Sequence, residues 1–261
     1  LIAARKNKKA VDRQDFLDAI DRIVGGLERR SKIISPAEKR TIAYHEAGHA
    51  TVSWWLPNAN PLLKVTIIPR GNALGAAWYL PEERQITTTE QMMDEMAATL
   101  GGRAAEEIIN GKISTGAMND LEKVTKQAYA MVTYFGMSDK VGNISFYDSS
   151  GNSGYNLSKP YSEKTAELID AEAKGFIDSA HATALKVLRE HMDGFTRLAE
   201  MLLEREVIFT DDLVKIFGER PGGQKPQSVT AESAPEAAAS ASTSSTADIQ
   251  ESHEEPAGQN A

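Results

Sequence analysis

The sequence predicts a mainly α-helical domain that carries a small β element. Three observations lead to this fold class: several long stretches repeat apolar residues at helical spacing, one short run is rich in β-branched residues, and strand-like segments are otherwise scarce. With 261 residues, of which 41% are hydrophobic, the chain is long enough to bury one sizeable core with a small domain appended.

The first two helices are predicted from apolar periodicity and from capping residues. Residues 12–24 form a short amphipathic pattern that ends at two glycines. The next helix begins near Ser35, which can cap it, while Pro36 suits the first turn and Glu38 completes a capping box. This second helix runs to about Leu56.

A small β element and a third helix follow. Residues 64–69 are the best strand of the chain because they are mostly β-branched, and a turn leads from them to a second extended run at 74–80. Thr87 and Glu90 then form a capping-box pair that opens a helix over residues 87–110.

The remaining chain is predicted to be helical up to a low-complexity end. A helix runs from residue 119 or 120 to 135, a glycine- and serine-rich loop follows, and the longest helix spans about 162–192. Short helices over 194–206 and 211–217 close the fold. Residues 219–261 consist mainly of Pro, Ala, Ser, Thr and Glu, so we expect a disordered acidic tail.

The composition restricts the possible partners of the chain. The net charge of −8 is concentrated at the end, where one lysine and six acidic residues lie from Pro221 onward, and no basic stripe suits nucleic acid. The densest apolar run, 47–56, has about half the roughly 20 residues that span a bilayer, so we expect this chain to be soluble.

The sequence His45-Glu46-Ala47-Gly48-His49 is the strongest functional signal. On a helix it places two imidazoles one turn apart on one face, where they can bind a single Zn²⁺ with Glu46 beside them as a general base. This layout is typical of zinc hydrolases. Chance is a weak alternative, because unpaired polar groups on a buried helix face cost about 2–7 kcal/mol.

A catalytic zinc site needs a third protein ligand, and the chain has no cysteine to supply it. Glu106 and Glu107 on the 87–110 helix would suit a thermolysin-like arrangement, and Asp120 begins the next helix. The alternatives are a solvated face for the two glutamates and a helix-terminus role for Asp120. Spacing alone does not choose among the three.

Four motifs in order resemble the FtsH family of membrane-anchored AAA proteases, over residues 1–218; they lie at 44–49, 100–107, 114–122 and 134–137. The resemblance implies that Asp120 is the third zinc ligand beside His45 and His49, and that Glu46 is the catalytic residue. It also implies structural or supporting roles for Glu106 and Glu107.

The same resemblance implies an organisation and a cellular setting. Residues 1–30 look like the end of an ATPase lid, 31–218 like the zinc metallopeptidase domain, and 219–261 remain the tail. We therefore expect a piece of a longer protein, a homo-hexamer at the cytoplasmic face of the bacterial inner membrane that degrades unfolded, misassembled or membrane proteins. ATP and Mg²⁺ would serve only an ATPase part, because this chain has no phosphate-binding loop. The main rival is a helical ring-assembly module with a structural metal site.

Overall fold

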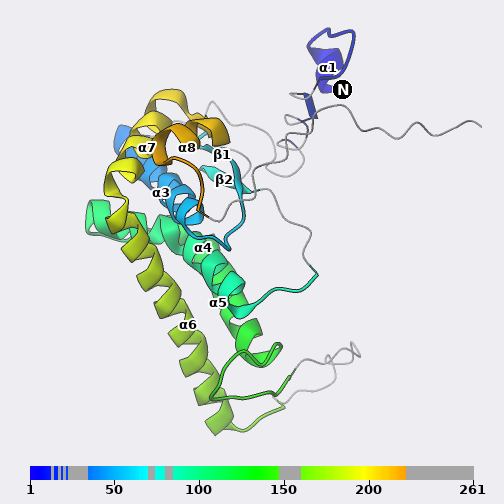
Figure 1. Cartoon of the computed structure of the whole chain (residues 1–261), viewed down its shortest axis with the longest axis vertical. Coiled ribbons are helices and arrows are strands. Elements are labelled where there is room, and N and C mark those ends of the chain that lie inside the picture. The colour runs from blue at the N-terminus through cyan, green and yellow to red at the C-terminus, as the bar shows by residue number, and fades with distance from the viewer. Residues whose placement is uncertain are drawn as a thin grey trace, which may run out of the picture. The chain divides into compact units, whose positions relative to one another are not determined.

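The computed structural model describes residues 1–12, 35–69, 74–79, 85–146 and 160–221, together with Asp15, Phe16, Ala19 and Arg22. The predicted mainly α-helical class with a small β element is confirmed (Figure 1). Most of the predicted 12–24 helix and all of the predicted tail beyond residue 221 lie outside the described residues. The elements are α1 (Ile2–Arg5), α3 (Pro36–Trp55), β1 (Leu62–Thr66), β2 (Ala76–Tyr79), α4 (Thr89–Asn110), η1 (Thr115–Ala117), α5 (Met118–Thr133), α6 (Glu163–Glu190), α7 (Met192–Arg205), β3 (Val207–Phe209) and α8 (Thr210–Phe217).

The helix starts follow from local capping chemistry. The Ser35 side chain accepts a hydrogen bond from the Glu38 backbone N–H at 3.2 Å, as the sequence predicts for the start of α3. The start of α4 was predicted one residue too early, because Thr88 rather than Thr87 is the N-cap and Gln91 completes the capping box. Neighbouring threonines followed by Glu and Gln offer both registers, so sequence alone could not separate them.

Within the described residues, the sheet has three antiparallel strands in the order β2-β1-β3, one more strand than the sequence predicts. Val65 of β1 lies opposite Ala77 of β2 on one side and Ile208 of β3 on the other. The third strand has only three residues between two helices, too few to show an alternating pattern. Strand β1 also starts and ends earlier than predicted, at 62–66. Among the described residues β2 pairs with β1 alone, so it forms an edge of the sheet there.

The two helices α3 and α4 approach so closely that glycine is required on both sides of their contact. A Cβ on Gly48 would lie 2.4 Å from the Gly101 carbonyl oxygen, and a Cβ on Gly101 would lie 2.7 Å from the Gly48 oxygen. Real Cβ atoms do not approach other atoms this closely, so larger residues would push the helices apart. The segment of α3 that carries the two histidines is therefore held against α4.

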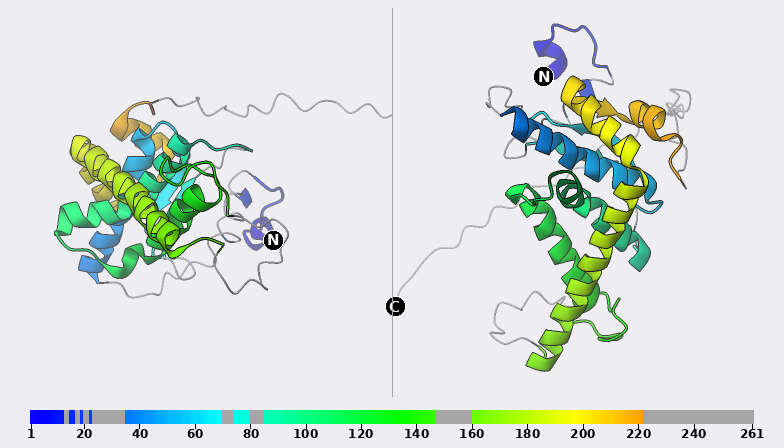
Figure 2. Two further views of the ribbon diagram at one scale, coloured as in Figure 1. Left: turned by 90° about the horizontal axis from the view of Figure 1, so that it is seen from below. Right: turned by 90° about the vertical axis from the view of Figure 1, so that its left-hand side faces the viewer.

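Further helices pack around this pair. Helix α6 contacts both α4 and α5, and α7 turns back at the end of α6 to pack on α3 (Figures 1 and 2). The rings of Tyr44 and Phe195 meet edge to face at 5.6 Å and join α3 to α7. Among the described residues, no helix combines the length and the apolar character of a membrane-spanning segment.

The last turn of α3 is held by a residue close to the end of the described chain. Arg220 donates hydrogen bonds to the carbonyl oxygens of Ser53 at 3.4 Å and Leu56 at 3.2 Å, and also to that of Ala59. A cation at a helix C-terminus satisfies free carbonyls and complements the helix dipole. The first residues of the predicted tail thus contact the helical domain.

Candidate metal centre

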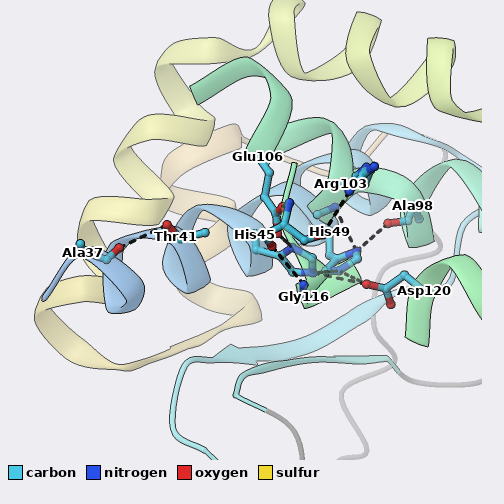
Figure 3. Close-up of polar contacts among 11 residues, drawn as sticks. Ala37, Thr41, His45, His49, Ala98, Arg103, Glu106, Gly116 and Asp120 are labelled. Atoms are coloured by element: carbon cyan, nitrogen blue, oxygen red, sulfur yellow. Dashed lines mark hydrogen bonds and ion pairs between the residues drawn. The ribbon is translucent and has the colours of Figure 1, made fainter. Parts of the chain in front are cut away.

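Three side chains from two helices converge at a buried point beside α3. His45 and His49 are 9% and 7% exposed, and their Nε2 atoms lie 3.0 Å apart. Asp120, in the first turn of α5, places Oδ2 at 3.3 Å from His45 Nε2 and 3.4 Å from His49 Nε2. Figure 3 shows Asp120 directed toward the two imidazoles, whose rings meet edge to face. The structure therefore brings together the three residues that the resemblance implies as ligands.

The spacing of these donor atoms suits a tetrahedral zinc ion. Ligand atoms about 2.0–2.2 Å from a tetrahedral metal lie about 3.3–3.6 Å from one another, close to the separations of 3.0, 3.3 and 3.4 Å found here. Two imidazole nitrogens and one carboxylate oxygen are also a donor set that Zn²⁺ favours. Within the described part of the chain, His45, His49 and Asp120 are the group of potential ligands that meets closely enough to hold an ion.

The carboxylates of the site favour a positive charge at the point where His45, His49 and Asp120 converge. Burial raises the pKa of Asp120, but hydrogen bonds from His45 and His49 outweigh burial and hold this pKa below its usual range. Burial disfavours a charged His45, but its hydrogen bonds to Asp120 and Glu106 and the Glu46 charge raise its pKa to about 10. A divalent cation would supply the charge that these carboxylates favour.

Groups on α4 fix the orientation of both imidazoles. His45 Nδ1 lies 2.8 Å from Glu106 Oε1, and His49 Nδ1 lies 3.0 Å from the Ala98 carbonyl oxygen. The Gly102 N–H is 3.3 Å from His49 Nδ1, and the shorter contact to the carbonyl favours Nδ1 as the donor. With a proton on each Nδ1, both Nε2 lone pairs face the shared point with Asp120.

Glu106 lies outside the group of three converging donor atoms. Glu106 Oε1 contacts His45 Nδ1, whereas the atom of His45 that lies near His49 and Asp120 is Nε2. The second carboxylate oxygen of Glu106 accepts a hydrogen bond from the Ser114 N–H at 2.8 Å. Burial raises the pKa of Glu106, but hydrogen bonds from His45 and Ser114 outweigh burial and lower it. Glu107 points elsewhere: its side chain is 45% exposed and lies 3.4 Å from His181 Nε2.

The family resemblance implied a structural or supporting role for Glu106, and the spacing along α4 holds a further signal that sequence reasoning did not use. Ala98, Gly102 and Glu106 are four residues apart, so they form one row along α4, and all three touch the imidazoles. A Cβ on Gly102 would lie 2.4 Å from His45 Nε2. At this spacing, the small residues Ala98 and Gly102 leave room for the imidazole rings, and the Glu106 carboxylate orients the His45 ring.

Glu46, a residue of α3, is buried against the segment that leads into β2. It is 7% exposed, and a Cβ on Gly75 would lie 2.7 Å from Glu46 Oε1, so only glycine fits there without moving the carboxylate. Burial raises the pKa of Glu46, and the His49 and His45 charges oppose this effect. The carboxylate lines a cleft of about 800 Å³ between α3, β2 and the segment that leads into α5.

Substitution of Glu106 by glutamine tests the orienting contact. The amide keeps the size of the side chain but loses the charge that holds His45, so zinc affinity is expected to fall about 10- to 100-fold. Competition with a chromogenic zinc chelator measures this change. Glu107→Gln is the matched control on the same helix, and equal zinc affinities for the two variants would contradict the role of Glu106.

The fold and the site together define a class of protein. A helix-borne His-Glu-x-x-His pair, a carboxylate from a second helix and a cleft over a buried glutamate are the features of a metallopeptidase domain. Residues 32–216 match the model of peptidase family M41. The chain belongs to this family, and the predicted resemblance and enzyme class are confirmed.

Relatives carry the same class in their names. The chain is 63% identical to an ATP-dependent zinc metalloprotease FtsH of Parabacteroides distasonis, over 84% of this chain and 32% of that protein. It is 53% identical to the mitochondrial ATP-dependent zinc metalloprotease FTSH 3 of Arabidopsis thaliana, over 85% of this chain and 27% of that protein. It is 48% identical to the mitochondrial inner membrane m-AAA protease component AFG3L2 of Mus musculus, over 86% and 28%. The chain thus spans about a third or less of these relatives.

Proposed function

We propose that this chain is the zinc endopeptidase part of an ATP-dependent protease, with His45, His49 and Asp120 as the zinc ligands and Glu46 as the general base. The observation that carries this proposal is the convergence of the three donor atoms beside a buried glutamate in a cleft. The names of the relatives support the zinc and the protease activity. A purely structural metal site, as in the assembly-module alternative, would have no use for a buried general base.

The residues of the cleft divide the reaction between them. Zinc bound to the three ligands would polarise the scissile carbonyl and make a water molecule acidic enough to react near pH 7. A carboxylate oxygen of Glu46 accepts the proton of this water and passes it to the leaving amine nitrogen, so that water adds across the C–N bond. The Glu106 contact holds His45 in the tautomer that the reaction needs.

The larger machine belongs to the same proposal. In a full-length protein, an ATPase part that uses ATP and Mg²⁺ would deliver unfolded, misassembled or membrane proteins to this cleft. The relatives named ATP-dependent zinc metalloproteases, which this chain covers only in part, support such an arrangement. A homo-hexamer at the cytoplasmic face of the bacterial inner membrane, with domains at 1–30, 31–218 and 219–261, stays a prediction.

Removal and return of the metal test the activity itself. We expect hydrolysis of unfolded casein by the chain to stop after dialysis against a chelator and to return when one equivalent of Zn²⁺ is added. Fluorescence of labelled casein measures turnover, and atomic absorption measures the bound metal. Hydrolysis that continues without metal would contradict the proposal, as would a zinc-loaded chain that cleaves neither casein nor a short peptide.

A further inference from the structure

One residue of the cleft has a position and a charge that the proposed reaction does not use. Lys123 lies on α5 three residues after Asp120, so both side chains project from the same face of that helix. Lys123 lines the same cleft as His45, Glu46 and Asp120. It is exposed in the described structure. Its ammonium group can therefore reach a peptide that occupies the cleft.

The charge of Lys123 is distinctive in its surroundings. Among the described residues that line the cleft it is the only lysine or arginine, whereas Glu38, Glu46, Glu106 and Asp120 supply carboxylates. Glu106 and Asp120 already contact the imidazoles. Glu38 lies about 12 Å along α3 from Glu46, two helical turns away. A substrate in the cleft thus meets one basic side chain, on the helix turn that also carries Asp120.

A neighbouring lysine on the same helix shows the contrast. Lys126 forms an ion pair with Glu122 at 2.5 Å, one turn away on the outer surface. Lys126 does not line the cleft. Within the described part of the chain, no ion pair of this kind joins Lys123 to a carboxylate. The charge of Lys123 also opposes the effect of burial on the pKa of Glu46, after the larger effects of His49 and His45.

We propose that Lys123 is a specificity-determining residue that binds an acidic side chain of the substrate next to the scissile bond. The inference rests on the proposed peptidase function and adds a substrate preference to it. An ammonium group at the cleft attracts a Glu or Asp side chain and repels Lys or Arg, so sequences with an acidic residue beside the cleaved bond are cut faster. Because the pair is partly solvated, the preference weakens as salt rises.

A purely electrostatic effect of Lys123 on Glu46 makes a different prediction. If the lysine only altered the basicity of Glu46, its removal would change the turnover of every peptide by one common factor. A specificity role changes the ratio between acidic and basic peptides instead. The ratio of kcat/KM values therefore separates the two roles.

The experiment compares quenched fluorescent peptides that differ only in one residue beside the cleaved bond, which is Glu, Gln or Lys, on each side in turn. The enzymes are the native chain, Lys123→Glu and the control Lys126→Glu, each with its zinc content measured. We expect the native chain to prefer Glu over Lys on one side of the bond. Lys123→Glu should shift that ratio about tenfold toward Lys, since attraction and repulsion each contribute a few-fold, while Lys126→Glu leaves it unchanged.

Binding without turnover keeps this proposal separate from the proposed function. The Kd values of the same peptides are measured on zinc-loaded Glu46→Gln, with and without Lys123→Glu, by fluorescence anisotropy. A Kd on Glu46→Gln that depends on peptide charge and loses this dependence in Lys123→Glu would support Lys123, whereas a zinc-loaded native chain that cleaves none of the peptides would contradict the peptidase function alone. Equal Glu-to-Lys ratios before and after Lys123→Glu, or one common factor for all peptides, would overturn the role of Lys123.

Discussion

The Glu46→Gln variant is expected to bind zinc like the native chain and to lose about 10²- to 10⁴-fold in kcat/KM on casein or a short peptide, because glutamine cannot accept a proton from water. Glutamine adds no heavy atom to the side chain, so it fits beside Gly75, where the absence of a Cβ leaves room for the Glu46 carboxylate. The His45, His49 and Asp120 donor atoms are unchanged. Turnover and bound zinc are measured on the same samples.

The stability of this variant provides an internal check. Burial raises the pKa of Glu46, so the folded chain binds this proton more tightly than the unfolded chain does. The charged carboxylate therefore lowers the free energy of unfolding once the pH exceeds the ordinary range of a glutamate. In the metal-free protein at neutral pH, glutamine removes this cost, and the Tm is expected to stay equal or to rise.

The exposed Glu107 supplies the matched control for this prediction. Glu107→Gln makes the same chemical change on a side chain that is 45% exposed and outside the cleft, so its turnover should equal that of the native chain. A Glu46→Gln variant that keeps more than about a tenth of the native kcat/KM would remove Glu46 from the role of general base.

Helical periodicity explains how much of the site could be predicted from the sequence. His45, Glu46 and His49 lie within one turn and a half of a helix whose start is marked by Ser35, so their mutual placement follows from local geometry alone. The donor distances within this set then depend on rotamers that α4 fixes. The first part of the site was therefore accessible to sequence reasoning before any tertiary contact was known.

The rest of the site depends on how two distant segments meet α3. Asp120 is 71 residues beyond His49, and spacing left it equal to Glu106 and Glu107 as a candidate; only the family resemblance favoured it. The contact of Glu106 with His45 arises from the crossing of α3 and α4 at their glycines, which no local pattern specifies. Strand β3 was missed for a related reason, since three residues gain their strand identity only by pairing with β1.

The Asp120→Ala variant is expected to weaken zinc binding by more than about 100-fold, because removal of a mere supporting partner of a ligand already costs 10- to 100-fold. The two imidazoles 3.0 Å apart would remain, but they would lack the anionic oxygen that lies 3.3 and 3.4 Å from them. Caseinolysis at limiting zinc should fall in parallel. Competition with a chromogenic chelator gives the affinity, and excess zinc should restore at most part of the activity.

The fold is expected to tolerate this change, which makes the zinc measurement interpretable. Asp120 stands in the first turn of α5, where an acidic residue contributes about 0.3–1 kcal/mol through the helix dipole, a small part of the stability of a domain. Circular dichroism at 222 nm checks that the helices persist.

The zinc affinities of Asp120→Ala, Glu106→Gln and the control Glu107→Ala show how much each carboxylate contributes to zinc binding. A strong loss in Asp120→Ala, a smaller one in Glu106→Gln and none in Glu107→Ala would match their distances from the imidazoles. Zinc affinity that is unaltered in Asp120→Ala would instead assign the third ligand to another group.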